Sequence, residues 1–317
     1  MLIANRLNVG GQAVIEGVMM RAPKSLAVAV RKPNGEIAVK KEPWKSISEK
    51  WPFLKLPFLR GTVVLLETLI NGIQALTFSA NQALEEEDIS KEMTSWAIFI
   101  SIASAMGLGL LLFLVLPHYL SGILLSSIGA NSDVSSLSFH VVDGVIKVAF
   151  FIGYIWLISL WKDIRRVFEY HGAEHKSIYA YEAGEALTVE NARKYSTMHP
   201  RCGTSFIVIV IVLSIFIFSV TFPFFPKPAG ASKLIMNLIY IVVKIFLMFP
   251  IAGISYEFIK LSGRNSQHPL IRLTSRPGLW VQKLTTREPS DDQLEIAIKA
   301  LSTVLFMETP ESEPHPS

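Results

Sequence analysis

The stretch GTSFIVIVIVLSIFIFSVTFPFF, residues 203–225, contains no charged side chain. A helix rises about 1.5 Å per residue, so a stretch of this length can cross the roughly 30 Å hydrocarbon core of a bilayer. Backbone polar groups in lipid must be hydrogen-bonded within their own segment, which makes a helix the expected conformation. The stretch therefore places the chain among the helical membrane proteins.

Three further runs, residues 96–116, 141–161 and 234–256, are similarly long and apolar. Half of the 317 residues are hydrophobic and 18% are charged. In soluble proteins about a quarter of all residues are charged. We expect a mainly α fold: a polytopic helical membrane protein with four transmembrane helices in residues 96–256, cytosolic helices and a small N-terminal β-hairpin unit.

The distribution of Lys and Arg orients these helices. Both residue types are frequent in residues 1–60 and 162–202 and absent from residues 117–140, which we expect to form a loop. Positively charged loops remain in the cytosol, so both termini and residues 162–202 are predicted to be cytosolic, in a multi-pass protein of the cytoplasmic membrane. An additional span in the apolar residues 62–84 would move the N-terminus outside. We therefore expect residues 61–95 to form an interfacial or re-entrant helix.

The first 60 residues combine a β unit with an interfacial segment. Asn34-Gly35 lies between two β-rich runs, a pattern typical of a hairpin. The glycine-rich residues 10–21 favour a strand entered by a tight turn over a functional loop. Residues 44–60 alternate aromatic and basic side chains, which suits the headgroup region of a bilayer. The bilayer is thus the predicted partner, and nothing else in the sequence supports nucleic-acid binding.

The C-terminal part, residues 257–307, is predicted to be cytosolic. Residues 263–289 are expected to be loop-rich and to lie on the membrane. Ser290 and Gln293 form a capping box that opens an amphipathic helix, whose apolar face packs on the protein or on a partner. Residues 308–317 are acidic and proline-rich, which is typical of a disordered tail.

His171, Glu174 and His175 form a His-x-x-Glu-His motif just beyond the second apolar run. The two histidines are four residues apart, so on a helix they face the same way and can hold one Zn²⁺. Glu174, lying between them without being a ligand, can accept a proton from a metal-bound water molecule. The alternative is a solvated polar face. We expect the second span to continue through the motif as one helix and to end near Gly184.

A catalytic zinc requires a third protein ligand, and two residues are candidates. Glu257 ends the fourth span and His199 precedes the third, so both are expected near the same membrane surface. A rival arrangement combines His171 and His175 with His199 and Cys202 in a closed structural zinc site. Cys202 is the only cysteine, so the chain has no internal disulfide and no sign of an oxidising compartment.

The membrane interior contains a second set of polar residues. Asp143 and Lys147 are spaced as a helical ion pair, whereas Lys244 lacks a nearby partner in sequence. A lone lysine in the membrane is costly unless it is paired, and Glu67 is a candidate partner. Such residues are also found in transporters, which makes transport the third functional hypothesis.

Three stretches together are similar to a known family: residues 10–21 (GGQAVIEGVMMR), 170–176 (YHGAEHK) and 199–204 (HPRCGT). They resemble the YqhQ-like bacterial membrane proteins, and the resemblance extends to about residue 306. It implies a multi-spanning bacterial membrane protein, labelled a predicted metal-dependent enzyme of unknown function. It implies no substrate.

Two principal functions follow from these patterns. The first is a metal-dependent hydrolase at the cytosolic face, with a divalent metal, Zn²⁺, bound by His171, His175 and either Glu257 or His199, and with Glu174 as the general base. The second is a non-enzymatic membrane scaffold or assembly factor, with a structural zinc site that includes Cys202 and with a membrane or cytosolic protein as partner.

Overall fold

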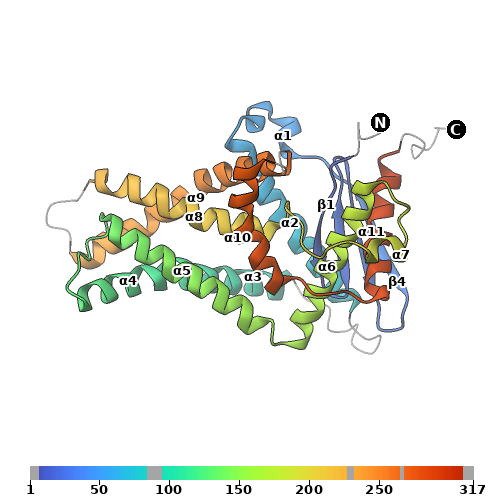
Figure 1. Cartoon of the computed structure of the whole chain (residues 1–317), viewed down its shortest axis with the longest axis horizontal. Helices are drawn as coiled ribbons and strands as arrows, with labels where there is room; N and C mark the ends of the chain where they lie inside the picture. The colour runs from blue at the N-terminus through green and yellow to red at the C-terminus, as the bar shows by residue number, and fades with distance from the viewer. Residues whose placement is uncertain (1–6, 84–94, 227–231, 265–267, 310–317) are drawn as a thin grey trace.

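The computed structural model describes residues 7–83, 95–226, 232–264 and 268–309. A helical bundle forms one end of the molecule, and a sheet covered by helices forms the other (Figure 1). In chain order the elements are β1 (Gly10–Val14), β2 (Gly17–Arg21), β3 (Ser25–Arg31), β4 (Ile37–Pro43), α1 (Ile47–Lys50), η1 (Pro52–Lys55), α2 (Leu59–Gln82), α3 (Ser95–Leu110), η3 (Leu111–Val115), α4 (Leu116–Ser127), α5 (Leu137–Ile158), α6 (Lys162–Ala183), α7 (Val189–Arg193), α8 (Gly203–Thr221), η4 (Phe222–Phe224), α9 (Lys233–Arg264), α10 (Pro269–Thr285) and α11 (Asp291–Met307).

Within the described residues, the strands form one antiparallel sheet in the order β1-β2-β3-β4. The predicted hairpin at Asn34-Gly35 is confirmed: Gly35 has a φ of +88°, and its N–H donates to the carbonyl of Lys32. A second tight turn, with Glu16 at a φ of +51°, joins β1 to β2. The small N-terminal β unit is therefore a four-stranded meander.

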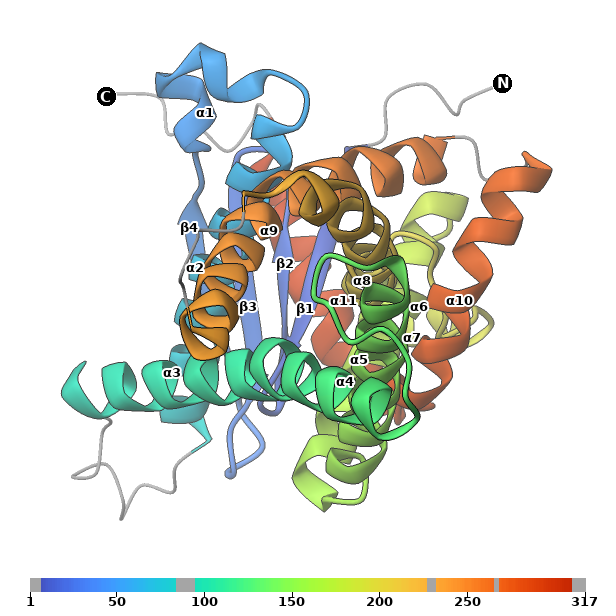
Figure 2. The ribbon, with the colours of Figure 1, turned by 90° about the vertical axis from the view of Figure 1, so that its left-hand side faces the viewer.

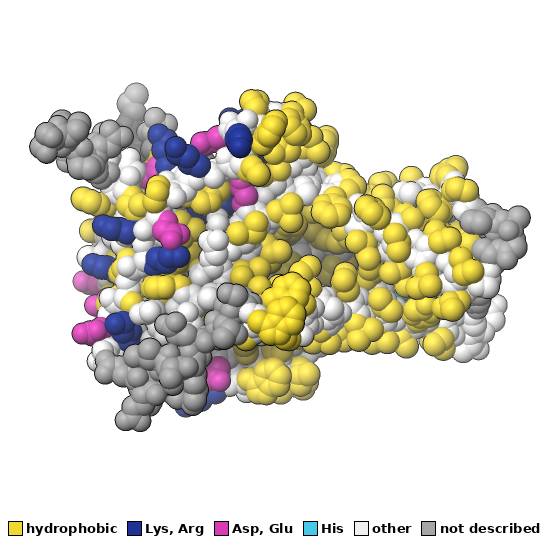
Figure 3. Space-filling view, turned by 180° about the vertical axis from the view of Figure 1, so that it is seen from behind, with side chains coloured by type: hydrophobic (Ala, Val, Ile, Leu, Met, Phe, Trp, Pro, Cys, Tyr) yellow, Lys and Arg dark blue, Asp and Glu magenta, His cyan; other side chains and the backbone are white. Residues whose placement is uncertain are grey.

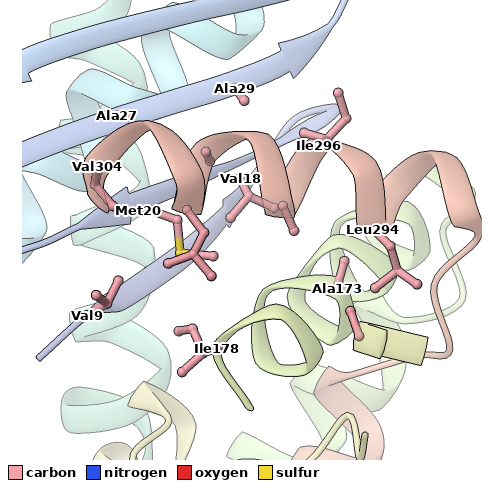
Figure 4. Packing of buried hydrophobic residues seen from close by; sticks show 14 of the residues in the cluster. Val9, Val18, Met20, Ala27, Ala29, Ala173, Ile178, Leu294, Ile296 and Val304 are labelled. Carbon is pink, nitrogen blue, oxygen red and sulfur yellow. The ribbon is translucent and has the colours of Figure 1, made fainter. Parts of the chain in front are cut away.

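Helices cover both faces of the sheet, because alternate residues of a strand point to opposite sides. One face packs against α6 and α11 (Figure 4). The other face packs against Ala75 and Phe78, in the C-terminal half of α2. The side chains of the first face include Val18, Met20, Ala27 and Ala29, and those of the second include Val14, Met19, Val28 and Val30.

Five helices in the described part of the chain are long and apolar enough to cross a membrane: Leu59–Gln82, Phe99–Ser127, Leu137–Ile158, Gly203–Phe224 and Leu234–Leu261. Hydrophobic side chains dominate the bundle surface in Figure 3, whereas the Lys, Arg, Asp and Glu side chains gather towards the sheet. These helices indicate a membrane protein. The interfacial placement of residues 61–95 stays a prediction, because α2 meets the same length and composition criteria.

The first helix of the bundle extends beyond its predicted end at residue 116. Residues Leu116–Ser127 continue as α4, so the loop expected from Pro117 begins only after Ser127. Figure 2 shows α3 and α4 as one continuous rod. The π-helical turn Leu111–Val115 immediately precedes Pro117. A proline inside a helix has no N–H to donate, and its ring clashes with the carbonyl group four residues earlier. A π-helical turn widens the helix at this point and relieves the clash.

Two expectations for the connecting segments were wrong. The helix of the second span does not continue through the motif: α5 ends at Ile158, and α6 begins at Lys162 after a short turn. Residues Pro269–Thr285, expected to be loop-rich, form helix α10, which packs on α8. Gly278 permits this packing, because a Cβ there would lie 2.5 Å from the Ser205 hydroxyl.

Other expectations are confirmed. Helix α6 ends where Gly184 adopts a φ of +81°, and both hydrogen bonds of the capping box between Ser290 and Gln293 are present. The apolar face of α11 packs on the sheet and on α6. The predicted disordered tail falls mainly on residues 310–317, which lie outside the described residues.

A buried ionic cluster joins the helices of the bundle. One carboxylate oxygen of Asp143 accepts hydrogen bonds from Lys147 at 2.7 Å and from Lys244 at 2.8 Å. Lys244 is fully buried, and its ammonium group also lies 3.2 Å from Nδ1 of His118. The partner of Lys244 is therefore Asp143, not Glu67, whose carboxylate binds Ser46 and the backbone of Ile47 near the sheet.

Substitutions in this cluster test its charge balance. Asp143→Asn leaves two buried ammonium groups without a counter-ion and is expected to cost about 3–5 kcal/mol of stability. Lys244→Met leaves the Asp143–Lys147 pair intact, so we expect a much smaller loss. Thermal unfolding in detergent measures both, with the exposed Lys55→Met as the control. Equal destabilisation by the two buried substitutions would contradict this account.

Candidate metal centre

His171, His175 and Cys202 converge at the junction of the bundle and the sheet-containing end. The histidines lie on α6, and Cys202 is the N-cap residue of α8. One potential ligand atom from each lies within 4.8 Å of the other two. Nε2 of His171 is 3.2 Å from Sγ of Cys202, and the two imidazole centroids are 4.4 Å apart. The structure thus combines both histidines of the motif with a residue distant in sequence.

Backbone carbonyl groups fix the orientation of both imidazoles. Nδ1 of His171 is 2.9 Å from the carbonyl oxygen of Thr285, and Nδ1 of His175 is 2.5 Å from that of Thr197. A carbonyl oxygen only accepts hydrogen bonds, so each Nδ1 donates a proton, and in the neutral imidazole Nε2 then has the lone pair that can bind a metal. Metal-binding histidines typically have such a partner on the second nitrogen.

Glu174 contributes a buried carboxylate beside the two imidazoles. Its Oε2 lies 3.3 Å from Nε2 of His175, and its side chain is 7% exposed. A carboxylate oxygen and an unprotonated imidazole nitrogen repel each other unless a proton or a cation lies between them. The carboxylate, the two imidazole nitrogens and the sulfur thus form a site that favours a cation.

The glycine-rich N-terminal strand encloses Glu174. A Cβ at Gly11 would lie 2.6 Å from Cγ of Glu174 and 2.8 Å from Sδ of Met20, so only a glycine fits without displacing them. In place of the single strand predicted over residues 10–21, the structure has two strands, β1 and β2, with the tight turn between them. In addition, Gly10 and Gly11 line the cavity beside the metal centre, so the backbone of β1 also shapes the site.

His199 lies beside the cluster, but both of its ring nitrogens have other partners. Its ring centroid is 5.7 Å from that of His175. Nδ1 accepts the backbone N–H of Arg201 at 3.3 Å, and Nε2 is 3.4 Å from Glu182. Burial lowers the pKa of His199, so the ring is neutral and donates from Nε2. In this orientation His199 does not join the three clustered residues.

Glu257, the other candidate for the third ligand, lies elsewhere. Its carboxylate forms a bidentate ion pair with Arg60, at the start of α2. It belongs neither to the cluster identified among the described residues nor to the cavity beside it. The three residues whose potential ligand atoms lie close together are therefore the two histidines and Cys202, without Glu257 or His199.

A cavity of about 160 Å³ adjoins the cluster. A single water molecule needs about 10–15 Å³ of such volume, so the cavity can hold several waters or the polar group of a small molecule. The cluster is therefore open on one side. The lining residues are Val9, Gly10, Gly11, His171, Glu174, His175, Ile178, His199, Arg201, Cys202 and Gly203.

Sequence reasoning did not identify the groups that hold these side chains. The carbonyls of Thr197 and Thr285 orient the imidazoles, and a backbone carbonyl has no sequence signature. Gln282 of α10 accepts the backbone N–H of His199 and donates to its carbonyl, both at 2.8 Å. Residues 263–289 were expected to be loop-rich, so nothing in the sequence indicated that Gln282 would hold the backbone of His199. The one available signal was Gly11, because its place in the glycine-rich residues 10–21 could have indicated a close approach of the backbone to another group.

The comparisons with known proteins place the chain in a family. A family model described as "Protein of unknown function (DUF1385)" matches residues 56–307. The chain belongs to this family. "Uncharacterized protein YqhQ" of Bacillus subtilis (strain 168) is 32% identical over 312 residues, which cover 94% of this chain and 92% of that protein. The resemblance to YqhQ-like proteins is thus confirmed. No solved structure matches the chain.

Gly172, between the two histidines, provides a test of the packing that fixes His171. Gly-to-Ala substitution in an exposed helix usually stabilises it by about 1 kcal/mol. A Cβ at Gly172 would instead overlap the carbonyl oxygen of Arg287, so we expect Gly172→Ala to destabilise the protein. Thermal unfolding in detergent measures the change. Gly153→Ala in α5, where a Cβ meets no atom within 4 Å, is the matched control. The packing account is refuted when Gly172→Ala is as stable as the control.

Proposed function

We propose that this protein is a zinc-dependent hydrolase at the cytosolic surface of the bacterial membrane. In this proposal His171, His175 and Cys202 bind the metal, and Glu174 is the general base. The observation that supports it best is the orientation of the two imidazoles. Each Nδ1 donates to a backbone carbonyl, so in the neutral ring each Nε2 can bind a metal, and these nitrogens lie beside Cys202 and Glu174.

The chemistry of the donor atoms favours zinc. Imidazole nitrogen and thiolate sulfur are its usual ligands, whereas Mg²⁺ and Ca²⁺ prefer oxygen. Three protein ligands leave one position open in a tetrahedral site, which is typical of catalytic zinc. The adjoining cavity of about 160 Å³ gives space for a water molecule and a substrate group at that position.

The residues around the metal position have distinct roles in this proposal. When bound, zinc would lower the pKa of a water molecule to about 7. Glu174 would accept the proton of that water and later donate it to the leaving group. The carbonyls of Thr197 and Thr285 would hold the imidazoles in place, so no reorientation is needed during the reaction.

The position of α6 supports a location close to the membrane surface. The helix begins at Lys162, just after the apolar helix α5, and His171 follows nine residues later, about 14 Å along the axis. Trp156 and Trp161 are exposed near this junction. Tryptophan is enriched at the headgroup level, and the many Lys and Arg of residues 162–202 favour the cytosolic side.

One observation favours a structural zinc site as the second candidate. His199 lies at the edge of the cluster, and a rotation of its side chain away from Glu182 would bring a fourth ligand towards the metal. Four protein ligands would close the site and tie α6 to α8, as in a membrane scaffold or assembly factor that binds a protein partner.

Metal analysis separates the two candidates. Detergent-purified wild-type protein is expected to contain about one zinc per chain by mass spectrometry. The double variant His171→Ala/His175→Ala and the variant Cys202→Ser should lose it, because each removes ligands of the open site. His199→Ala should retain it. If His199→Ala loses as much of its zinc as Cys202→Ser, the closed structural site is favoured. Wild-type protein without zinc would exclude both the catalytic and the structural zinc site.

The role of Glu174 gives a further test. Glu174→Gln should keep its zinc but hydrolyse a panel of fluorogenic esters and amides about 10²–10⁴-fold more slowly, because the general base is lost. Glu190→Gln, an exposed residue of α7, is the control and should match the wild type. Hydrolysis by Glu174→Gln at the wild-type rate would contradict the catalytic assignment.

A further inference from the structure

A large apolar cavity, open on one side, lies among the helices of the bundle. Its volume is about 710 Å³, and α2, α3, α5, α8 and α9 supply most of its wall. Each of these helices lies wholly or largely within a segment long and apolar enough to cross a membrane. The cavity is therefore at the level expected for lipid acyl chains. Its apolar lining includes Leu65, Phe113, Phe151, Ile211 and Met248.

One end of this cavity adjoins the candidate metal centre. Thr204 and Thr285 line that end. The hydroxyl of Thr204 is 2.9 Å from Sγ of Cys202, and the carbonyl of Thr285 is the group that orients His171. Phe168, one helical turn before His171, also lines the cavity. A molecule in the cavity would thus contact Thr204 and Thr285, which in turn contact the proposed zinc ligands Cys202 and His171.

The ionic cluster lies beside the opposite end. Lys147 and Ser214 line the cavity there. The ammonium group of Lys147 is hydrogen-bonded to Asp143 at 2.7 Å. Along α8, the step from Thr204 to Ser214 is ten residues, or about 15 Å. The cavity is therefore a long apolar compartment with a catalytic candidate at one end only.

We propose that this cavity binds the hydrocarbon chain of a membrane lipid and presents its acyl ester to Glu174. The reaction in this proposal rests on the proposed hydrolase function, whereas chain binding does not. The polar part of the lipid would extend into the smaller cavity of about 160 Å³, where Arg201, His199 and the backbone of Gly10 and Gly11 supply polar groups.

Polarity favours a lipid chain over an extended peptide. An extended peptide would fit, but its N–H and C=O groups would lack partners on the apolar wall. A hydrocarbon chain has no polar group to satisfy, and its burial is favourable in proportion to its area.

The reaction proposed for the bound lipid is ester hydrolysis. Water adds its oxygen to the ester carbonyl carbon while one of its protons passes to Glu174. The bond between the acyl carbon and the glycerol oxygen then breaks, and Glu174 returns the proton to that oxygen. The products are a fatty acid and a lysolipid, and no oxidant or further co-reactant is needed.

Photo-crosslinking tests whether the cavity holds a chain. The full-length protein is reconstituted in phosphatidylglycerol and phosphatidylethanolamine vesicles that contain phosphatidylglycerol with a diazirine in its acyl chain. After irradiation, mass spectrometry locates the labelled residues. We expect label on the buried Leu114 and Phe151, which line the cavity, in addition to Val212 and Phe216 on the exposed surface. Label on the exposed residues alone would overturn the proposal.

Two glycines of α3 provide a matched pair of variants. A Cβ at either Gly107 or Gly109 meets no atom within 4 Å, so both positions accept a larger side chain without a backbone clash. Gly109 lines the cavity, and Gly107 does not. Gly109→Trp should reduce labelling of Leu114 and Phe151 about ten-fold by filling the space, whereas Gly107→Trp should leave it unchanged. Equal labelling in both variants would overturn the proposal.

The same samples separate chain binding from catalysis. His171→Ala should lose zinc and release of fatty acid but keep the cavity labelling. Gly109→Trp should keep zinc but lose both labelling and fatty-acid release. Cavity labelling without zinc or hydrolysis in the wild type would refute the proposed function alone. Efficient labelling of the cavity by a photoactivatable single-span peptide, in place of the lipid, would overturn the lipid assignment in favour of a protein substrate.

Discussion

The geometry of the candidate site depends on two hydrogen bonds from imidazole nitrogens to backbone carbonyls. Thr197 precedes α8 and Thr285 ends α10, so the two carbonyls that hold His175 and His171 come from different parts of the chain. Both segments must be fixed relative to α6 for the two Nε2 atoms to meet. The packing of α10 on α8 through Gly278, and the hydrogen bonds of Gln282 to the backbone of His199, provide that constraint.

The sheet holds α6 from the other side. Helices α6 and α11 share one face of the sheet, and β1 approaches α6 so closely that Gly11 has no room for a side chain beside Glu174. Helix α2 links this unit to the bundle, because its N-terminal half packs against α9 and its C-terminal half against the sheet. The candidate site therefore lies where the sheet unit meets the apolar helices.

The sequence predicted local features well and long-range contacts poorly. Apolar length predicted the bundle helices, Asn34-Gly35 the hairpin, and Gly184 the end of α6, because each depends on residues close in sequence. Whether Cys202, His199 or Glu257 lies beside the two histidines depends on how side chains from separate segments point. Spacing along the sequence does not determine these directions. Spacing also could not show which carboxylate pairs with Lys244. Glu67 was the predicted candidate, but Asp143 of α5 binds both Lys147 and Lys244.

The central claim is that the site is an open one, with two imidazoles and one thiolate as its protein ligands. X-ray absorption at the zinc K-edge of the purified wild-type protein measures this directly. The account predicts one sulfur at about 2.3 Å, two imidazole nitrogens at about 2.0–2.1 Å and one further light atom from water. A shell with three imidazoles and one sulfur, or one without sulfur, would contradict it.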